Sequence, residues 1–240
     1  MANIDSSNSR QQLLDTLAQV ARGLGNGNRL ELLECLAQAE APVEALALAT
    51  NLSVANASQH LQQLRRAGLV TARRDGRHMF YRLTDERIVT LLGLLRQIAE
   101  SNLAEVERLV GQLFADADGA LEPMSRNELL AGLERGDVTL LDVRPAEEYR
   151  AGHLPGAVNV PIEALERMLD LLPQDKEIVA YCRGPYCVFS HEATQLLRQH
   201  GIAARRYAEG FPEWKAAGLP IGRGEGGEGI GVGPPCAGGP

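Results

Sequence analysis

Apolar residues in the first half of the chain recur at the three- and four-residue steps of an amphipathic helix. A first helix is indicated by Leu13, Leu14, Leu17 and Val20. The same spacing returns over residues 28–40. Two more helices are expected to begin near Pro42 and Ser53, because proline and serine are favoured where a helix starts. The chain therefore opens with a mainly helical domain.

The pattern changes over residues 69–83 and then becomes helical again. Asp75-Gly76 separates two arms of strand-like composition, which predicts a β-hairpin. Residues 86–115 again show apolar positions at helical spacing. A single helix of that length spans roughly 45 Å, more than so small a domain can cover. We expect its apolar stripe to pack against a second copy of the chain.

The second half alternates short apolar runs with helical stretches. The runs are "VTLLDVR", "AVNVP", "IVAYC" and "AARRYAEG". Strands that alternate with helices are typical of an α/β domain with a mostly parallel sheet. The pattern therefore predicts two domains, a mainly α N-terminal domain with a hairpin and an α/β C-terminal domain.

Composition sets the expected domain boundaries. We expect a disordered polar start over 1–10, domains over 11–117 and 125–221, and a linker of small, acidic and turn-forming residues over 118–124. Residues 222–240 are dominated by Gly and Pro and cannot bury enough surface to order themselves, so a disordered tail is expected.

The charge distribution points to a nucleic-acid partner in one region only. The net charge of −7 argues against a uniformly basic coat, yet residues 60–87 hold seven arginines against three acidic residues. The polar first residues and the lack of a long apolar run lead us to expect a cytoplasmic protein with no membrane contact. Thiols are kept reduced in that compartment, so the four cysteines are not expected to form a disulfide scaffold.

Helix, tight turn, helix and basic hairpin form the layout of a winged helix-turn-helix. The helix at 53–68 would place its N-terminal residues against base edges in the major groove. Its candidate base contacts are Asn56, Ser58, Gln59 and His60. The hairpin's candidates for phosphate or minor-groove contact are Arg73, Arg74, Arg77 and His78.

These segments resemble the ArsR/SmtB family of repressors over about residues 10–115. The words that carry the resemblance are "NRLELLECLAQAE", "LSVANASQHLQQLRRAGLV" and "RRDGRHMFYRL". The resemblance implies a homodimer through residues 86–115 on a palindromic DNA operator. The chain departs from the sensing members: it has no Cys-x-Cys motif before the reading helix, Asp85 has no histidine partner after it, and Cys35 stands alone. Cys35 is expected to be a small buried residue, so sensing should come from the second domain.

The second domain contains the stretch "IVAYCRGPYCVFSHEATQLL". A strand that ends at Cys182, an arc and a helix that begins near Val188 would direct backbone N–H groups at the sulfur. Such a setting lowers a thiol pKa and favours the nucleophilic thiolate.

The words around Cys182 resemble a rhodanese (sulfurtransferase) domain across about residues 124–221. They are "LLDVRPAEEYRAGHLPGAVNVP", "IVAYCRGPYC" and "YAEGFPEWKAAGLPI". The resemblance implies that Cys182 takes a sulfane sulfur as a persulfide and passes it to a thiol acceptor. It also implies that Asp142 and Arg144 brace the loop and that Arg183 follows the nucleophile.

One departure from that family concerns the end of the loop. The usual Cys-Arg-x-Gly-x-Arg closes on arginine, whereas this chain has Cys187 there and its glycine is displaced to Gly184. Loss of the arginine removes an anion-binding fork, which predicts weak turnover of thiosulfate. Cys187 instead offers a second thiol that can resolve a Cys182 persulfide to a disulfide.

Other readings of the cysteine pair stay open. Phosphate-ester hydrolysis does not fit the loop length. The alternatives are a dithiol site for arsenite or a soft metal, with or without His191, and a structural role for Cys187. His153 is expected to belong to a structural turn, and Cys236 has no assigned role.

The leading hypothesis is a dimeric repressor whose rhodanese domain senses sulfane sulfur, with no metal or cofactor. The alternatives are a sulfurtransferase enzyme with a DNA-tethering domain and an arsenite- or metal-responsive repressor.

Overall fold

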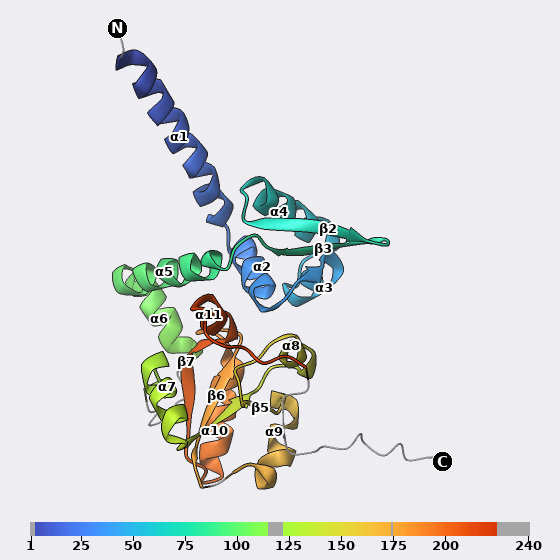
Figure 1. Cartoon of the computed structure of the whole chain (residues 1–240), viewed down its shortest axis with the longest axis vertical. Helices are drawn as coiled ribbons and strands as arrows, with labels where there is room; N and C mark the ends of the chain where they lie inside the picture. Colours follow the sequence, from blue (N-terminus) through green and yellow to red (C-terminus); the bar gives the residue numbers. More distant parts are fainter. Residues whose placement is uncertain (1–2, 115–121, 174, 225–240) are drawn as a thin grey trace. The chain divides into compact units, whose positions relative to one another are not determined.

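The protein consists of two compact units, Met1–Ile98 and Ala99–Pro240. Its structure is a computed structural model that describes residues 3–114, 122–173 and 175–224 (Figure 1). Each unit has its own sheet and its own buried core. The division into a mainly helical part and an α/β part agrees with the sequence pattern.

The first unit contains the expected helices and hairpin. Its elements are α1 (Asn3–Leu24), α2 (Gly27–Gln38), β1 (Ala41–Pro42), α3 (Val43–Ala49), α4 (Val54–Arg66), β2 (Val70–Asp75), β3 (His78–Leu83) and the start of α5 (Arg87–Asn102). The three strands form an antiparallel sheet in the order β1-β3-β2. Strand β1 was not expected, because its two residues are too short to show a period and Pro42 also stands before α3.

The core of the first unit holds α4 in place. Leu32 and Leu33 on α2 are fully buried, as are Leu61 and Leu64 on α4. The hydroxyl of Ser53 accepts a hydrogen bond from the backbone N–H of Asn56 at 3.2 Å, which caps the start of α4. The apolar side of α4 is thus fixed against the domain body, and its first turn is set at a defined residue.

The hairpin closes one residue later than predicted. Asp75 pairs with His78, so the two loop residues are Gly76 and Arg77. Gly76 has φ = 58°, a left-handed conformation that glycine adopts without steric cost. The Asp75-Gly76 signal therefore located the turn but not its two central residues.

Two predicted boundaries differ from the structure. Helix α1 begins at Asn3, whereas residues 1–10 were expected to be disordered. The polar side chains of that segment give no apolar period, yet nothing in it stops a helix from extending towards its N-terminus. The units divide at Ile98 and Ala99, well before the predicted linker at 118–124, because residues 99–114 contact the second unit.

The helix predicted over 86–115 is interrupted. The structure has α5 (Arg87–Asn102) and α6 (Ala104–Leu113), with Leu103 between them at φ = −120° and ψ = 99°. Ser101 and Asn102 precede the break, and both residue types compete for backbone hydrogen bonds in helix interiors. The apolar period continued through the break, which is why the pattern alone did not show it.

The second unit is an α/β layer built on a parallel sheet. Its elements after α6 are α7 (Arg126–Arg135), β4 (Val138–Asp142), α8 (Ala146–Ala151), β5 (Val158–Asn159), α9 (Ile162–Met168), a 3-10 turn (Leu169–Leu171), β6 (Glu177–Cys182), α10 (Val188–Gln199), β7 (Ala204–Gly210) and α11 (Phe211–Ala216). The strand order is β5-β4-β6-β7, all parallel. Helix α7 opens with a capping box between Ser125 and Glu128.

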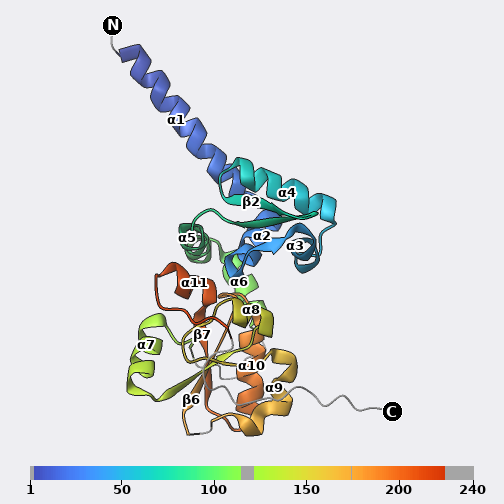
Figure 2. The ribbon, with the colours of Figure 1, turned by 45° about the vertical axis from the view of Figure 1, so that its right-hand side comes forward.

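Helices cover both faces of this sheet. One core cluster joins the sheet to α9 and α10 and includes Cys182 and Ala193. The other joins it to α7, α8 and α11 and includes Tyr181 and Trp214. Figure 2 shows α7 on one side of the strands and α9 and α10 on the other. Because side chains alternate along β6, Tyr181 and Cys182 point to opposite faces.

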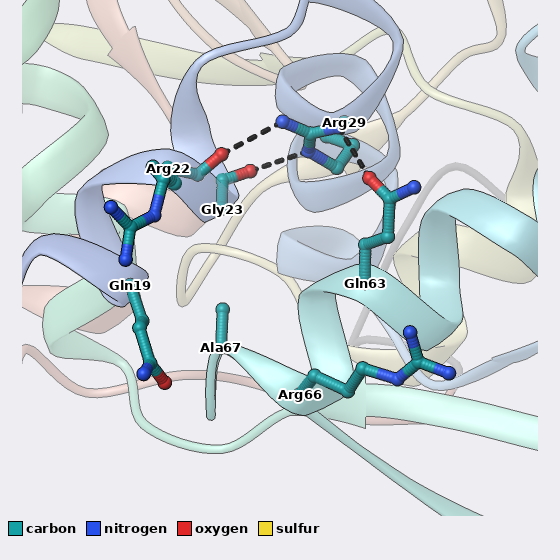
Figure 3. Close-up of a pocket in the computed structure, with 7 residues that line it drawn as sticks. All are labelled: Gln19, Arg22, Gly23, Arg29, Gln63, Arg66 and Ala67. Atoms are coloured by element: carbon teal, nitrogen blue, oxygen red, sulfur yellow. Dashed lines mark hydrogen bonds between the residues drawn. The ribbon is translucent and has the colours of Figure 1, made fainter. Parts of the chain in front are cut away.

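A single arginine ties the first helix to the body of the first unit. The guanidinium of Arg29 donates to the carbonyl oxygens of Gly23 at 2.6 Å and Arg22 at 2.8 Å, and to Oε1 of Gln63 on α4 at 2.7 Å. A cavity of about 260 Å³ lies here, and in Figure 3 the side chains of Arg22 and Arg66 point away from one another. The arginines therefore do not converge on a common ligand, and Arg29 serves as a structural bridge.

Replacing Arg29 by Met should remove three hydrogen bonds while keeping the aliphatic stem. We expect the free energy of opening of α2 and α4 to fall by about 2 kcal/mol, because the partly buried carbonyl of Gly23 and the partly buried amide of Gln63 lose their charged donor. Hydrogen exchange of peptides from the two helices measures this fall. Arg66→Met, at an exposed residue of the same cavity, should change it by less than about 0.5 kcal/mol. Equal effects of the two changes would contradict the bridging role.

Candidate functional site

The candidate base contacts on α4 are not equally available. Asn56 and Gln59 are exposed and Ser58 is half-buried. His60 turns towards the body, where its Nε2 lies 3.5 Å from the Asn28 amide nitrogen on α2. Its Nδ1 is buried and has no hydrogen-bond partner among the described residues. Among the four candidates, Asn56 and Gln59 are thus the exposed side chains.

The basic residues of the hairpin also differ in how far their charge is neutralised. Arg73 forms ion pairs with Glu40 and with Asp75, and its guanidinium lies 4.7 Å above the centroid of the Phe80 ring. The Arg73 charge is therefore already compensated within the domain.

The tip of the hairpin keeps positive charge. The side chain of Arg74 donates to the carbonyl oxygen of Gly76 at 3.1 Å, and that of Arg77 donates to Nε2 of His78 at 3.3 Å. His78 in turn lies 3.4 Å from a carboxylate oxygen of Glu44. Because these partners are neutral acceptors, the charges of Arg74 and Arg77 are not compensated by an acid among the described residues.

In the second unit, the two cysteines of the loop are joined. Strand β6 ends at Cys182, and Cys187 is the residue that precedes α10. The two form a disulfide with Cα atoms 6.3 Å apart. Cys182 is buried and Cys187 is half-buried. The first backbone N–H groups of α10 have no acceptor within the helix, so this end of the loop favours negative charge on sulfur.

The path of the loop depends on a glycine of the neighbouring strand. Gly210 ends β7 and stands opposite Cys182 in the sheet register. A Cβ built on Gly210 would lie 2.6 Å from the Cα of Gly184 and 2.7 Å from the carbonyl carbon of Arg183. The loop backbone thus fills the space that any side chain at position 210 would need.

A buried ion pair stands behind the loop. The guanidinium of Arg144 donates to both carboxylate oxygens of Asp142, the shortest distance being 2.6 Å, and to the carbonyl oxygen of Gly152 at 2.8 Å. Both side chains are fully buried. Removing one partner of such a pair typically costs about 3–5 kcal/mol. The pair braces the end of β4, and it lies too deep to meet a substrate in this structure.

The arginine that follows Cys182 is paired as well. The guanidinium of Arg183 donates to both carboxylate oxygens of Glu148 on α8, at 2.5–3.1 Å, and lies 5.5 Å from the centroid of the Phe189 ring. Its charge is therefore compensated by an acid that comes 35 positions earlier in the chain. An anion at this site would have to compete with Glu148.

Two other polar side chains near the sheet, Tyr181 and His153, are also buried. Burial raises the pKa of the Tyr181 phenol well above its usual value, and the phenol oxygen accepts a hydrogen bond from the N–H of Leu154. His153 is buried and stacks on Tyr149, with ring centroids 3.8 Å apart, as expected of a structural position.

Cys35 is half-buried instead of fully buried, and Cys236 lies outside the described residues. The described residues contain no group of three or more His, Cys, Asp or Glu side chains placed to hold a metal ion.

The structure thus unites residues that the sequence named separately, and it adds two that were not named. Cys182 meets Cys187, and Asp142 meets Arg144. Glu148 and Gly210 were overlooked, although each lies inside a quoted motif, because neither residue type signals a role without knowledge of its neighbour in space.

Gly210→Ala should displace the loop that carries the cysteine pair. Backbone atoms of Arg183 and Gly184 must shift to admit the methyl group, so the reaction of Cys182 with a sulfane sulfur donor should slow about tenfold or more. Mass spectrometry of the sulfur-modified protein against time gives the rate. Gly218→Ala serves as a comparison in an open turn and should leave the rate unchanged. An unchanged rate in Gly210→Ala would show that the loop does not depend on this contact.

Comparison with known proteins agrees with both units. Residues 24–73 match a helix-turn-helix domain family, and residues 125–217 match the rhodanese-like domain family. The chain is 44% identical over 218 residues to the HTH-type transcriptional regulator Rv0324 of Mycobacterium tuberculosis, which covers 91% of this chain and 95% of the relative.

Other relatives match one half each. The human thiosulfate:glutathione sulfurtransferase is 36% identical over 107 residues, which cover 38% of this chain and 90% of that protein. The solution structure of the homodimeric winged helix-turn-helix domain of Mb0332 from Mycobacterium bovis is 41% identical, covers 44% of this chain and 95% of that one, and has a TM-score of 0.39.

The described part of the chain contains no helix with both the length and the apolar character needed to cross a membrane.

The 44% identity to the regulator Rv0324 extends over nine-tenths of the chain, so it includes both units and the segment that joins them. The protein therefore belongs to the family of ArsR-type helix-turn-helix transcriptional regulators that carry a C-terminal rhodanese-like domain.

Proposed function

We propose that this transcriptional regulator senses sulfane sulfur by forming the disulfide between Cys182 and Cys187. The observation that carries the proposal is that the two sulfurs are within bonding reach across a four-residue loop, at the start of a helix. We place the protein in the cytoplasm, where thiols are kept reduced. The dithiol is then the resting state, and the disulfide is the response.

The chemistry needs a sulfane sulfur donor such as a thiol persulfide or a polysulfide. The Cys182 thiolate attacks the outer sulfur of a thiol persulfide, the donor's S–S bond breaks, and the donor leaves as a thiolate. Cys182 then carries a persulfide. The Cys187 thiolate attacks the Cys182 Sγ, the bond to the added sulfur breaks, and hydrosulfide leaves. Two thiols are oxidised to a disulfide while the sulfane sulfur is reduced to hydrosulfide.

The charges at the site favour donors of low charge. The bidentate pair between Arg183 and Glu148 compensates the one arginine of the loop, and Cys187 replaces the arginine that usually closes it. Thiosulfate, a dianion, finds little uncompensated positive charge here. The aromatic ring of Phe189 beside Arg183 adds an apolar surface. We therefore propose a thiol persulfide or polysulfide as the natural signal.

The DNA-binding half is proposed to act as a homodimer on a palindromic operator. Large apolar side chains on α1, α5 and the segment after it are exposed, which a lone copy would leave in water. They are Leu13, Leu14, Leu17, Leu91, Leu94, Leu95, Ile98, Leu103, Leu109 and Leu113. The related domain from Mycobacterium bovis is homodimeric. A dimer would pair two copies of α4, as a palindromic site requires.

Sulfurtransferase catalysis is the second candidate. It is favoured by the match of residues 125–217 to the rhodanese-like family, with a cysteine at the position of the nucleophile. In that case sulfur passes from Cys182 to an external thiol, and the DNA-binding half only localises the enzyme. The two proposals differ in which thiol reacts with the Cys182 persulfide. In the sensor it is Cys187, and in the enzyme it is an external thiol.

Serine substitutions of the cysteines separate these roles. Cys182→Ser should gain no sulfur from glutathione persulfide. Cys187→Ser should retain one added sulfur atom on Cys182 and release hydrosulfide at least about tenfold more slowly than the parent, because the resolving thiol is gone. Mass spectrometry and a hydrosulfide assay measure both, with Cys35→Ser as the control.

The operator affinity of the same samples, taken together with their sulfur products, decides between the candidates. Loss of operator binding together with disulfide formation supports the sensor. Many turnovers of sulfur transfer to glutathione per protein, with DNA affinity unchanged, would favour the enzyme and overturn the sensor.

Substitutions on the DNA-binding half test the division between phosphate and base contacts. Arg74→Ala and Arg77→Ala should weaken binding on all sequences and reduce the salt slope by about 1 each. Gln59→Ala should cost about 1–3 kcal/mol on the preferred operator and little on unrelated DNA. Fluorescence anisotropy with an operator selected from a random duplex pool measures these values. Arg167→Ala, at an exposed arginine of α9, is the control, and an equal loss there would contradict the assignment.

A further inference from the structure

The loop between the two cysteines is contacted by residues of the segment 99–114, which belongs to the second unit. The hydroxyl of Tyr186 donates to Oε1 of Glu100 at 2.5 Å. Tyr186 directly precedes Cys187, and Glu100 lies in the last turn of α5. A side chain next to the reactive pair is thus bonded to the helix that leads from the DNA-binding unit.

The other end of the segment meets the same region. The Phe114 ring lies edge-on to His191 in the first turns of α10, with centroids 5.2 Å apart. The guanidinium of Arg206 lies 4.6 Å above the Phe114 ring and donates to the carbonyl oxygen of Pro185 at 3.3 Å. Burial lowers the pKa of Arg206, which shows how closely this group is enclosed. Two consecutive loop residues, 185 and 186, therefore have partners that lead to the segment 99–114.

The loop is held at one end and adjustable at the other. At the start of the loop, Arg183 is paired with Glu148, and the backbone of Gly184 fills the space above Gly210. At the end of the loop, Cys187 is held by the disulfide to Cys182, by its backbone N–H, which donates to the Gly184 carbonyl at 3.1 Å, and by its carbonyl oxygen, which accepts from the Ser190 hydroxyl at 3.4 Å. Opening the disulfide removes a covalent restraint there. Any change in loop shape is therefore concentrated at Tyr186 and Cys187.

Helix α5 connects Glu100 to the core of the first unit. Its first half buries Ile88, Val89 and Leu92 in the core of the first unit, and its last turn carries Glu100 in the second. The helix is continuous over Arg87–Asn102. A restraint on Glu100 is therefore applied to the same helix whose other end forms part of the DNA-binding core.

We infer that the hydrogen bond between Tyr186 and Glu100 couples the state of the cysteine pair to the helix α5. The inference rests on the proposed function and adds its regulation. The disulfide holds Tyr186 against Glu100, and the dithiol or the Cys182 persulfide releases it. Coupling of this kind is reciprocal, so the contact must also shift the equilibrium between dithiol and disulfide.

The test uses the full chain in its dithiol and disulfide forms, set by dithiothreitol buffers. In the parent, the amides of residues 99–113 should exchange about fivefold or more slowly in the disulfide form. Tyr186→Phe should abolish this difference and shift the equilibrium towards dithiol by the same factor. Glu100→Gln should reduce the difference, because an amide oxygen is a weaker acceptor than a carboxylate. The double variant should shift it no further. Glu107→Gln, an exposed acid of α6, is the matched control and should behave as the parent does.

Equal amide hydrogen-exchange rates in the dithiol and disulfide forms of the parent overturn the inference. It is also overturned if the Tyr186→Phe and Glu100→Gln variants behave as the parent does. DNA affinity, measured with a duplex selected by the dithiol parent, separates this failure from failure of the proposed function. If affinity responds to the cysteine state and the two variants respond equally, the sensor stands and the coupling contact is wrong. If exchange and equilibrium behave as expected while affinity is indifferent, the contact stands and the sensor is wrong.

Discussion

The close approach of two backbones, at Gly210 and Gly184, is the constraint on which the reactive loop depends. The loop begins at a buried cysteine on a central strand and ends at the first residue of a helix. Only the absence of a side chain at position 210 lets the chain turn there and return within five residues. Because of that turn, Cys187 lies opposite Cys182, and the first amides of α10 lie at the same end of the sheet. The proximity of the two cysteines follows from this steric fact before any charge is considered.

Charge compensation distinguishes the arginines of the two units from one another. In both units an arginine beside the functional residues is compensated by an acid: Arg183 by Glu148, and Arg73 by Glu40 and Asp75. Arg74 and Arg77, at the tip of the hairpin, form no ion pair with an acid among the described residues. Counting arginines in the sequence treats all of them alike. The structure separates those that neutralise an internal acid from those that remain to attract phosphate.

The sequence predicted the elements that repeat a period and missed those that depend on a neighbour in space. The helices of the first unit and the four parallel strands were evident from apolar spacing. The break at Leu103 was hidden because apolar residues continue across it, and β1 was hidden because two residues have no period. At the site, the cysteines were visible as unusual residues near one another in the chain. Glu148 was not, since its partner lies 35 positions away.

The capping box at Ser125 has a consequence for how such a chain can arise. Helix α7 satisfies its own first backbone donors with the side chains of Ser125 and Glu128. Met124, just before this helix, also belongs to the rhodanese-like fold, because it is buried and its backbone bonds to Arg206 and Ala208 on β7. The rhodanese-like fold therefore begins at Met124. A gene fusion could join it to many different predecessors without loss of folding.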